Sequence, residues 1–294
     1  MTDHIPRISV GMPVYNGEPY LAAAIEAVLS QTFTDFELII CDNASTDGTE
    51  AICRAAAERD ARVRYVRNAE NIGAARNYNH CFELASGEYF RWMNADDLAE
   101  PTLHERCLST LEAYPEAVLA YGKTRLIDTD GHVTADYEDG LDLREPSPSE
   151  RFRRLFRSVG LTNVIYGLMR REAVGRTGLM GDGRLPAADI RLMAELSLLG
   201  QFIEIPEPLF YRRMHSESSS ADRNDDARQA TFWRGSSGRT RFRLPHWRTH
   251  LGYFRTIARL DLDLREQLRV AAYVARRMVW SRADLARDLL HLFG

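Results

Sequence analysis

Several patterns that mark common protein classes are missing from this chain. No apolar run approaches the roughly 20 residues of a membrane-spanning helix, because the longest uncharged stretch covers only residues 158–169. Residues 1–7 lack the apolar core of a secretory signal peptide, and no lipidation motif stands at the C-terminus. These absences lead us to expect a cytoplasmic protein.

Cysteine and lysine are scarce. The four cysteines are widely spaced and form no C-x-x-C pair, which predicts buried free thiols and no zinc site. Lys123 is the one lysine among 38 basic residues, a bias that we attribute first to GC-rich coding DNA. The formal net charge is −4, so no overall positive field attracts nucleic acid and we expect no nucleic-acid partner.

Three sequence signatures of nucleotide and hydrolase chemistry are absent as well. The chain has no G-x-x-x-x-G-K-[ST] loop, so we do not expect a P-loop NTPase. No G-x-G-x-x-G follows the first apolar strand, which argues against a dinucleotide oxidoreductase. No serine lies in a G-x-S-x-G motif, which argues against a serine hydrolase. Other side chains must supply the chemistry.

The first 125 residues alternate between apolar strands and helical patterns. With 45% hydrophobic and 27% charged residues, the 294-residue chain has the composition of a globular protein. Strand–helix alternation predicts an α/β protein with a doubly wound, mostly parallel sheet. The expected strands are Ile8–Met12, Phe36–Cys41, Val63–Val66, Glu88–Met93 and Val118–Tyr121.

Polar clusters follow three of these strands, at Pro13–Glu18, Asp42–Asp47 and Asn94–Asp97. Doubly wound sheets bind ligands at the carboxyl ends of their strands. Two adjacent carboxylates, Asp96 and Asp97, suit Mg²⁺ or Mn²⁺, which prefer oxygen ligands. Alternatively, one of these two aspartates only caps the helix that begins near Pro101.

The remaining chain is less regular. Residues 128–149 are polar and predict a loop with a small hairpin, and residues 188–199 predict a helix followed by a strand at 202–205. Residues 216–228 predict a mobile loop, and from Leu251 onward the chain is helical and rich in arginine.

Six segments carry motifs that occur together, in this order, in one enzyme family. They are Ile8–Glu18 with P-x-Y-N-x-E, Phe36–Thr49 with D-[DN]-x-S-x-D-x-T, Asn71–Asn77 with N-x-G and A-R-N, Ala85–Asp97 with A-x-G-E-Y and D-x-D-like residues, Ala188-Asp189, and Arg213-Met214-His215. From about Ile8 to Ser220 the chain resembles the family 2 glycosyltransferases.

The resemblance implies a GT-A fold and a division of the chain. Residues 1–220 would form the GT-A domain, with 1–125 as the nucleotide-sugar half and 126–220 as the acceptor half. Residues 221–294 would form a mobile loop and a helical C-terminal extension.

The resemblance also implies roles for individual residues. Asp189 would be the general base, and Asp96 and Asp97 would hold the divalent metal. His215 matches a position that contacts metal, diphosphate or acceptor. The nucleotide-binding positions would be Pro13, Tyr15, Asn16, Glu18, Asp42, Asn43, Asn71, Arg76, Asn94 and Asp96.

Each assignment has a plainer structural alternative. These are a helix N-cap for Asp189, an Asx-turn residue for Asp42, a core tyrosine for Tyr15, a solvated helix arginine for Arg76 and a structural hydrogen-bonding residue for His215. If Asp189 is only a cap, Glu195 and His215 are the next candidates for the base.

Two positions depart from the family pattern. Asn94 stands where the family usually has the first aspartate of its D-x-D motif, and Ala188 stands where glutamate often precedes the catalytic aspartate. An asparagine can hydrogen-bond a ribose hydroxyl but is a poor metal ligand. Metal binding would therefore depend on Asp96 and Asp97.

These observations predict a metal-dependent, inverting glycosyltransferase with a nucleotide-sugar donor, UDP-sugar by family frequency. The metal stabilises the nucleoside diphosphate that leaves, and a general base activates the acceptor hydroxyl. The acceptor would be a glycan, a lipid-linked molecule or a small molecule. The alternatives are a nucleotidyltransferase, although residues 12–16 are not its usual glycine- and arginine-rich loop, and a non-catalytic nucleotide-sugar-binding protein, which Asn94 would permit.

The arginine-rich C-terminal segment, including residues 276–280, permits two interpretations. Its composition suits peripheral contact with the inner face of a membrane, where a lipid-linked acceptor would be met. The alternative is a helical tail that packs on the domain.

Overall fold

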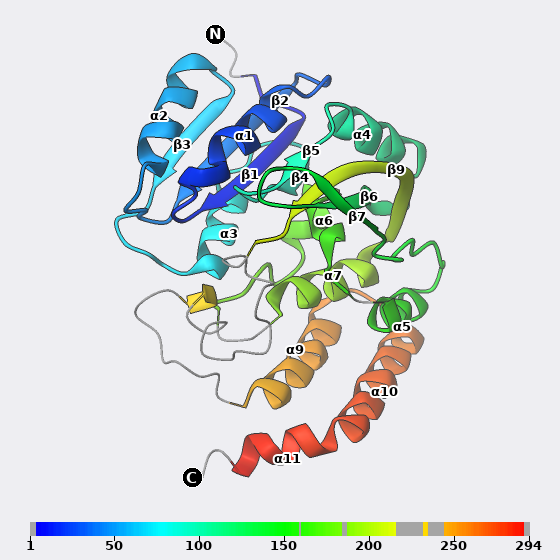
Figure 1. The fold of residues 1–294 in the computed structure, drawn as a ribbon. Coiled ribbons are helices and arrows are strands. Elements are labelled where there is room, and N and C mark those ends of the chain that lie inside the picture. The colour runs from blue at the N-terminus through cyan, green and yellow to red at the C-terminus, as the bar shows by residue number, and fades with distance from the viewer. Residues whose placement is uncertain (1–3, 159, 184–186, 216–231, 235–243, 291–294) are drawn as a thin grey trace.

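A nine-stranded sheet forms the centre of the molecule (Figure 1). A computed structural model describes residues 4–158, 160–183, 187–215, 232–234 and 244–290. Along the sheet the strand order is β3-β2-β1-β4-β8-β6-β9-β5, and β7 pairs with β6. The α/β fold expected from the sequence is confirmed.

The N-terminal half is the parallel part of the sheet. Its strands are β1 (Ile8–Val14), β2 (Phe36–Asp42), β3 (Val63–Arg67) and β4 (Tyr89–Trp92). The connecting helices are α1 (Glu18–Leu29), α2 (Thr49–Arg59) and α3 (Ala74–Glu83). β1 is buried along its whole length, and apart from Ser9 its residues are apolar, as expected for a strand at the centre of a parallel sheet. Asp42 pairs in register with Val14 on one side and Arg67 on the other, so the loops after three strands meet at one edge.

The second half of the sheet is mixed. Its strands are β5 (Leu98–Ala99), β6 (Ala117–Ile127), β7 (Val133–Tyr137), β8 (Leu168–Arg170) and β9 (Gln201–Arg213). β6 runs parallel to β9, whereas β4 and β6 pair antiparallel with β8, and β5 with β9. The hairpin expected within residues 128–149 begins earlier than predicted, because its first strand is the end of β6 and only β7 and the turn before Val133 lie in that range.

β9 is much longer than the strand predicted at 202–205. Two prolines follow Ile205, and prolines normally interrupt a strand. The pairing with β6 shifts register there, from Gly122↔Ile205 to Lys123↔Pro208, so a bulge accommodates the prolines and the strand continues. This extension brings Tyr211 opposite Leu98 and the end of β9 beside the loop that follows β4.

Helices cover the second half of the sheet and continue into the C-terminal segment. They are α4 (Leu103–Ala113), α5 (Pro148–Ser158), α6 (Arg171–Gly175), α7 (Ala188–Leu199), α9 (Pro245–Arg259), α10 (Leu264–Trp280) and α11 (Arg282–Leu290), with a 3₁₀ helix at Asn163–Tyr166. The helix predicted at 188–199 is confirmed as α7, whereas α5 was not foreseen. α10 packs against α5 and α9, away from α1 and α2 (Figure 1).

Within the described parts of the chain, no helix combines the length and the apolar character that crossing a bilayer requires. The mobile loop predicted at 216–228 lies outside the described residues. All four cysteines are buried free thiols, as the sequence predicts: Cys41, Cys53, Cys81 and Cys107.

Glu195 fixes α9 to α7. Its carboxylate is 3% exposed and accepts hydrogen bonds from Thr256 Oγ1 at 2.7 Å, Arg259 Nη2 at 2.6 Å and the backbone N–H of Gly178 at 2.6 Å. A carboxylate with three donors in a buried position holds neighbouring elements together. Because its carboxylate already accepts these three hydrogen bonds, Glu195, which the sequence offered as an alternative base, has a structural role.

We expect Glu195→Ala to lower the free energy of unfolding by about 3 kcal/mol, because each buried donor left without a partner costs about 1–3 kcal/mol. Urea denaturation followed by circular dichroism measures this change. The matched control is Glu58→Ala, an exposed glutamate of α2, which should stay within about 0.5 kcal/mol. Equal effects of the two substitutions would contradict the role given to Glu195.

Candidate active site

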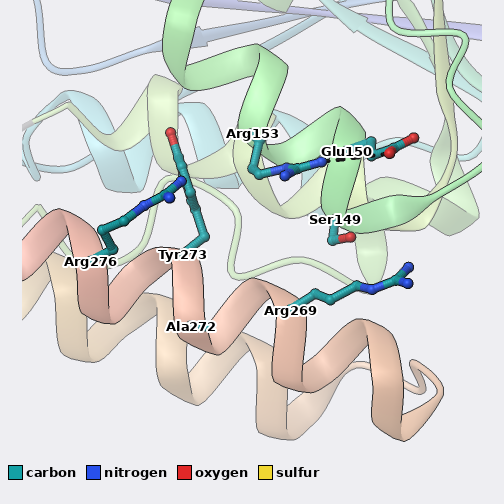
Figure 2. Close-up of a pocket in the computed structure, with 7 residues that line it drawn as sticks. All are labelled: Ser149, Glu150, Arg153, Arg269, Ala272, Tyr273 and Arg276. Atoms are coloured by element: carbon teal, nitrogen blue, oxygen red, sulfur yellow. Dashed lines mark ion pairs between the residues drawn. The ribbon is translucent and has the colours of Figure 1, made fainter.

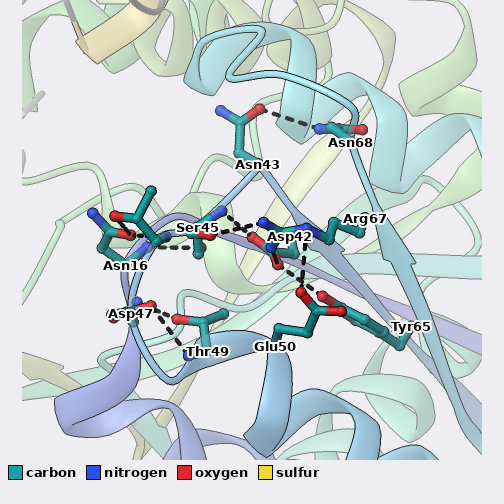
Figure 3. A network of polar contacts seen from close by, with 12 residues as sticks. Asn16, Asp42, Asn43, Ser45, Asp47, Thr49, Glu50, Tyr65, Arg67 and Asn68 are labelled. Atoms are coloured by element: carbon teal, nitrogen blue, oxygen red, sulfur yellow. Dashed lines mark hydrogen bonds and ion pairs between the residues drawn. The ribbon is translucent and has the colours of Figure 1, made fainter.

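The loops that follow β1 and β2 are locked to each other (Figure 3). Asn16 donates its backbone N–H to Ser45 Oγ at 2.9 Å and accepts the N–H of Thr46 on Oδ1 at 2.9 Å. Glu18 accepts the N–H of Gly48 at 2.9 Å and donates its own N–H to Asp47 Oδ2 at 3.1 Å. Asn16 has a φ of 52°, a conformation that asparagine adopts more readily than most residues. Two of the predicted nucleotide-binding residues, Asn16 and Glu18, therefore define the shape of this edge.

Asp42 lies at the end of β2 and is fully buried. Its carboxylate accepts hydrogen bonds from Tyr65 Oη at 2.8 Å and the backbone N–H of Ser45 at 2.8 Å, and it forms an ion pair with Arg67 (Figure 3). Burial and the hydrogen bond to Asp42 raise the pKa of Tyr65 well above its usual value. Asp42 thus caps the loop through a bond to the backbone three residues on, a turn-forming role close to its structural alternative. Its predicted contact with a base edge stays a prediction.

Amide side chains connect the loop after β2 to the loop after β3. Asn43 donates from Nδ2 to Asn71 Oδ1 at 2.9 Å and accepts from Asn68 Nδ2 at 3.1 Å. Asn68 also donates to Asn77 on α3. These bonds hold predicted nucleotide-binding residues Asn43 and Asn71 next to each other, although they lie 28 residues apart in the chain.

Tyr15 and Arg76 remain open to solvent beside these loops. Tyr15 is 50% exposed at the end of β1, so it is not the core tyrosine that the sequence left as an alternative. Arg76 lies on the exposed side of α3, within its first turn. Pro13, by contrast, is buried within β1. The exposed ring and guanidinium are groups that can contact a planar base and a diphosphate.

The loop after β4 carries Asn94 within a network of neutral and charged groups. Its Oδ1 accepts from Tyr78 Oη at 2.5 Å, and its Nδ2 donates to Tyr166 Oη at 2.6 Å and to Asp97 Oδ2 at 3.0 Å. An aspartate could not make the two donor bonds. The neighbours of position 94 therefore suit an asparagine rather than the aspartate that is usual in the family.

Asp97 is buried, with 1% exposure. Its Oδ1 accepts the backbone N–H of Arg213 at 2.8 Å, and its Oδ2 accepts from Asn94. Burial raises the pKa of Asp97 to about 7, and the charge of Asp96 adds to this rise, whereas Arg212 and the two hydrogen bonds lower it. With its oxygens turned toward protein donors, Asp97 positions the loop more than it presents a ligand.

Asp96 is the carboxylate that reaches solvent. It is 28% exposed, and its Oδ2 lies 2.9 Å from His215 Nε2. The His215 ring packs against Tyr20, with 5.3 Å between the ring centroids, and the Arg213 guanidinium lies 4.6 Å from the same tyrosine ring. A carboxylate oxygen beside an imidazole nitrogen is a donor pair that Mn²⁺ or another divalent cation accepts. The residues present thus fit a metal ion at Asp96 and His215.

Arg212 is a buried cation that the sequence analysis did not single out. It donates to the Leu161 carbonyl at 3.0 Å and to Asn163 Oδ1. Burial lowers the pKa of its guanidinium. The charges of Tyr166 and of three carboxylates, Asp97, Asp96 and Asp189, outweigh this effect, so the pKa of Arg212 is raised overall. All three predicted catalytic and metal-binding carboxylates therefore act on one arginine. Its sequence signal is its position directly before the R-x-H motif at 213–215.

Asp189 lies in the first turn of α7 and is partly buried. The N-cap of this helix is Ala187, with a φ of 53°, so Asp189 does not occupy the cap position that was its structural alternative. Its charge acts on Tyr253 of α9 as well as on Arg212. A carboxylate at this end of a helix is favoured in its ionised form by the helix dipole.

A second group of possible metal ligands lies on the turn between β6 and β7. Asp128, Asp130 and His132 have ligand atoms within 4.8 Å of one another. Asp130 and His132 are exposed, and Asp128 Oδ1 already accepts the backbone N–H groups of both. This arrangement is an ordinary Asx-type turn, and Arg213 joins it to Asp96 by donating to the carbonyls of Asp128 and Asp96.

Comparison with known sequences identifies relatives. A family model described as Glycosyl transferase family 2 matches residues 9–178, which is more than half of the chain. EpsE of Bacillus subtilis, described as a putative glycosyltransferase, is 41% identical over 110 residues, covering 37% of this chain and 40% of its own length. Chondroitin synthase of Escherichia coli is 28% identical over 229 residues, covering 78% of this chain and 32% of its own. The chain thus spans less than half the length of these two relatives.

Solved structures share the fold. TarS of S. aureus in complex with UDP-GlcNAc superimposes with a TM-score of 0.65 at 16% identity, covering 94% of this chain and 74% of that one. The mannosyltransferase PcManGT from Pyrobaculum calidifontis, in complex with GDP-Man and Mn²⁺, gives 0.55 at 18% identity, covering 98% and 85%. The GT-A fold expected from the sequence is confirmed, and with a family model over more than half of its length this protein belongs to glycosyl transferase family 2.

Proposed function

We propose that this protein transfers a sugar from a nucleotide-sugar donor to an acceptor hydroxyl, with inversion at the anomeric carbon. The observation that carries the proposal is that the charges of Asp96, Asp97 and Asp189 all act on the buried Arg212. Arg212 lies at the end of β9, which a hydrogen bond joins to the loop after β4. The structural neighbours TarS and PcManGT were solved with UDP-GlcNAc and GDP-Man, respectively. A UDP-sugar is the donor that we propose first.

The donor binds to residues 1–125 in this proposal. The interlocked loops after β1, β2 and β3 form a preorganised edge, so little ordering entropy is lost when the nucleotide binds. Tyr15 stacks on the base, Asp42 and Asn43 form the floor beside it, and Arg76 contacts the diphosphate. These positions come from three strand–helix connections, which a parallel sheet brings together.

Asp96 would hold the metal, with His215 as its neighbour. A bound divalent cation supplies Lewis-acid stabilisation of the departing diphosphate. Asp97 keeps the loop in place by accepting the backbone N–H of Arg213. The amide of Asn94 is engaged by Tyr78, Tyr166 and Asp97. The main ligand is therefore Asp96, and Asp97 supports it.

The acceptor binds to residues 126–220, beside Asp189. The Asp189 carboxylate takes the proton of the acceptor hydroxyl while that oxygen attacks the anomeric carbon and the nucleoside diphosphate leaves from the opposite face. The positive charge of Arg212 acts on Asp189 and Asp96, and it opposes the rise that burial causes in the pKa of Asp97. A single displacement of this kind inverts the configuration of the sugar.

Asp189→Asn tests the base. An amide cannot accept the proton, so we expect transfer to fall by about two to four orders of magnitude, with donor affinity and thermal stability close to those of the wild type. Product analysis measures transfer, and it also separates a transferase, which releases a nucleoside diphosphate, from a nucleotidyltransferase, which exchanges pyrophosphate. Asp261→Asn, an exposed position, is the matched control. A variant that keeps more than roughly a tenth of wild-type transfer would exclude Asp189 as the base.

Metal removal tests the second part of the proposal. EDTA should abolish turnover and Mn²⁺ should restore it, because the charge on the leaving diphosphate needs a cation. Asp96→Asn should cut transfer by about 100-fold or more at saturating Mn²⁺. Asp130→Asn, on the β6–β7 turn, should keep its activity and its response to Mn²⁺. Full activity in EDTA, or loss of the Mn²⁺ response in Asp130→Asn alone, would contradict a metal at Asp96.

Asn94→Asp tests the neutral network around the metal position. The new carboxylate would face Asp97 Oδ2 at hydrogen-bond distance and lose its donor bonds to Asp97 and Tyr166. We expect the free energy of unfolding in EDTA to fall by about 2 kcal/mol, with recovery of part of this loss in Mn²⁺ because the cation neutralises the added charge. Thermal denaturation in the two buffers measures both effects, with the wild type in the same buffers as reference. Unchanged stability in EDTA would show that the site accepts an acid at position 94 without a cation.

A further inference from the structure

The outer face of α10 carries large apolar side chains in contact with solvent. Leu264, Leu268, Val279 and Trp280 are 69%, 61%, 59% and 62% exposed. The first three lie on one side of the helix together with Ala272 and Ala275, because spacings of three and four residues return to the same side. The opposite side of α10 packs against α5 and α9. Four exposed side chains of this size on one helix form an apolar surface whose contact with water is unfavourable.

A row of arginines borders this apolar stripe. Arg265, Arg269 and Arg276 follow one another along α10 at helical spacing. Arg269 and Arg276 line the groove toward α5. Between α10 and α5 lies a groove of about 530 Å³ whose lining includes Arg153, Arg269 and Arg276 (Figure 2). Arg276 lies 4.9 Å from the Trp280 ring, which keeps its guanidinium at the border between the row and the apolar side chains.

The acidic residues of this segment face inward or are paired. Glu266 accepts the backbone N–H of Ser149 at 2.7 Å, and Asp288 is buried beside His246. Arg265 and Arg276 have no carboxylate partner among the described residues. Residues 264–290 contain six arginines against three acidic residues, a net charge of +3, whereas the whole chain carries −4. Three of these arginines, Arg265, Arg269 and Arg276, lie on α10, the helix that also exposes leucine, valine and tryptophan.

We infer that this face of α10 docks on a membrane surface that contains anionic phospholipid. Leucine and valine side chains would enter the boundary of the acyl chains, tryptophan would lie at the headgroup level, and the arginines would contact lipid phosphates. Each exposed arginine near an anionic leaflet contributes about 1 kcal/mol. A second copy of this chain fits less well, because self-association would bring two positive faces together.

Docking on this face also orients the catalytic half. α10 packs on α5, α5 packs on α7, and α7 begins next to Asp189. Glu195 joins the same α7 to α9. A membrane under α10 would therefore be mechanically coupled to the helix that carries the proposed base, so the acceptor class that suits this geometry is a lipid-linked molecule; this last step rests on the proposed function.

Vesicle flotation of the full 294-residue chain tests the inference. The two probes are vesicles of phosphatidylcholine alone and vesicles of equal parts phosphatidylcholine and phosphatidylglycerol. We expect binding to the mixed vesicles and little to the neutral ones. Raising NaCl from about 0.1 to about 1 M, which shortens the Debye length from about 10 to about 3 Å, should release most of the protein.

Two double variants separate the charged and apolar contributions. Arg265→Gln with Arg276→Gln should weaken binding to the mixed vesicles about 30-fold, from about 1 kcal/mol per arginine. Leu264→Ser with Leu268→Ser should weaken it by about tenfold or more, and both pairs are exposed enough to leave the fold intact. Arg54→Gln with Arg59→Gln removes the same charge from the surface of α2 and should leave vesicle binding unchanged.

Trp280 gives a local readout. Its emission should shift to shorter wavelength on the mixed vesicles, and Trp280→Phe should lose this shift while it retains most of the binding. Absence of binding to the mixed vesicles, or equal weakening by the α2 control, would overturn the inference. A second result would also overturn it: the protein forms concentration-dependent dimers in sedimentation, the double variant Leu264→Ser with Leu268→Ser abolishes these dimers, and the protein does not bind vesicles. Calorimetry of donor binding in solution is independent of α10, so failure of the docking surface and failure of the proposed function give different results.

Discussion

The site depends on one constraint, namely that a buried carboxylate needs donors around it. Asp97 has almost no contact with solvent, and an isolated charge there would cost several kcal/mol. The backbone N–H of Arg213 and the amide of Asn94 satisfy its two oxygens, and the charge of Arg212 acts on it. These partners come from β9 and from the loop after β4, two segments more than 100 residues apart. The end of β9 must therefore reach this loop before His215 can lie beside Asp96, as the proposed site requires.

The two halves of the molecule contribute in different ways. In the N-terminal half, short hydrogen bonds between loops fix the edge of a parallel sheet, and the polar residues there are largely satisfied by one another. In the second half, the charges of three carboxylates act on Arg212, and the side chain of Asp96 is partly exposed to solvent. Under the proposed function, the hydrogen-bonded loops would hold the nucleotide, and the charged groups beside them would stabilise the diphosphate as it leaves.

The C-terminal helices extend this architecture. Their inner sides complete the hydrophobic core with Val270, Tyr273 and Val274, and Glu195 ties them to the helix of the proposed base. Their outer side departs from the rule that large apolar groups avoid water. The same helix thus stabilises the acceptor half and presents a surface of different chemistry, so a surface contact and the geometry of the site can influence each other.

The sequence by itself determined the strand–helix order of residues 8–125, the buried cysteines, the helix at 188–199 and the polar clusters at the strand ends, because periodicity and local motifs are properties of neighbouring residues. It also placed Asp96, His215 and Asp189 among the candidates. Only the tertiary structure decided that Asp97 is buried while Asp96 is partly exposed, and that Glu195 binds residues of α9. It also decided that β9 continues beyond its two prolines and that three carboxylates act on the buried Arg212. The reason is physical: burial, long-range hydrogen bonds and the field of one charge on another arise between segments distant in the chain, and no local pattern records them.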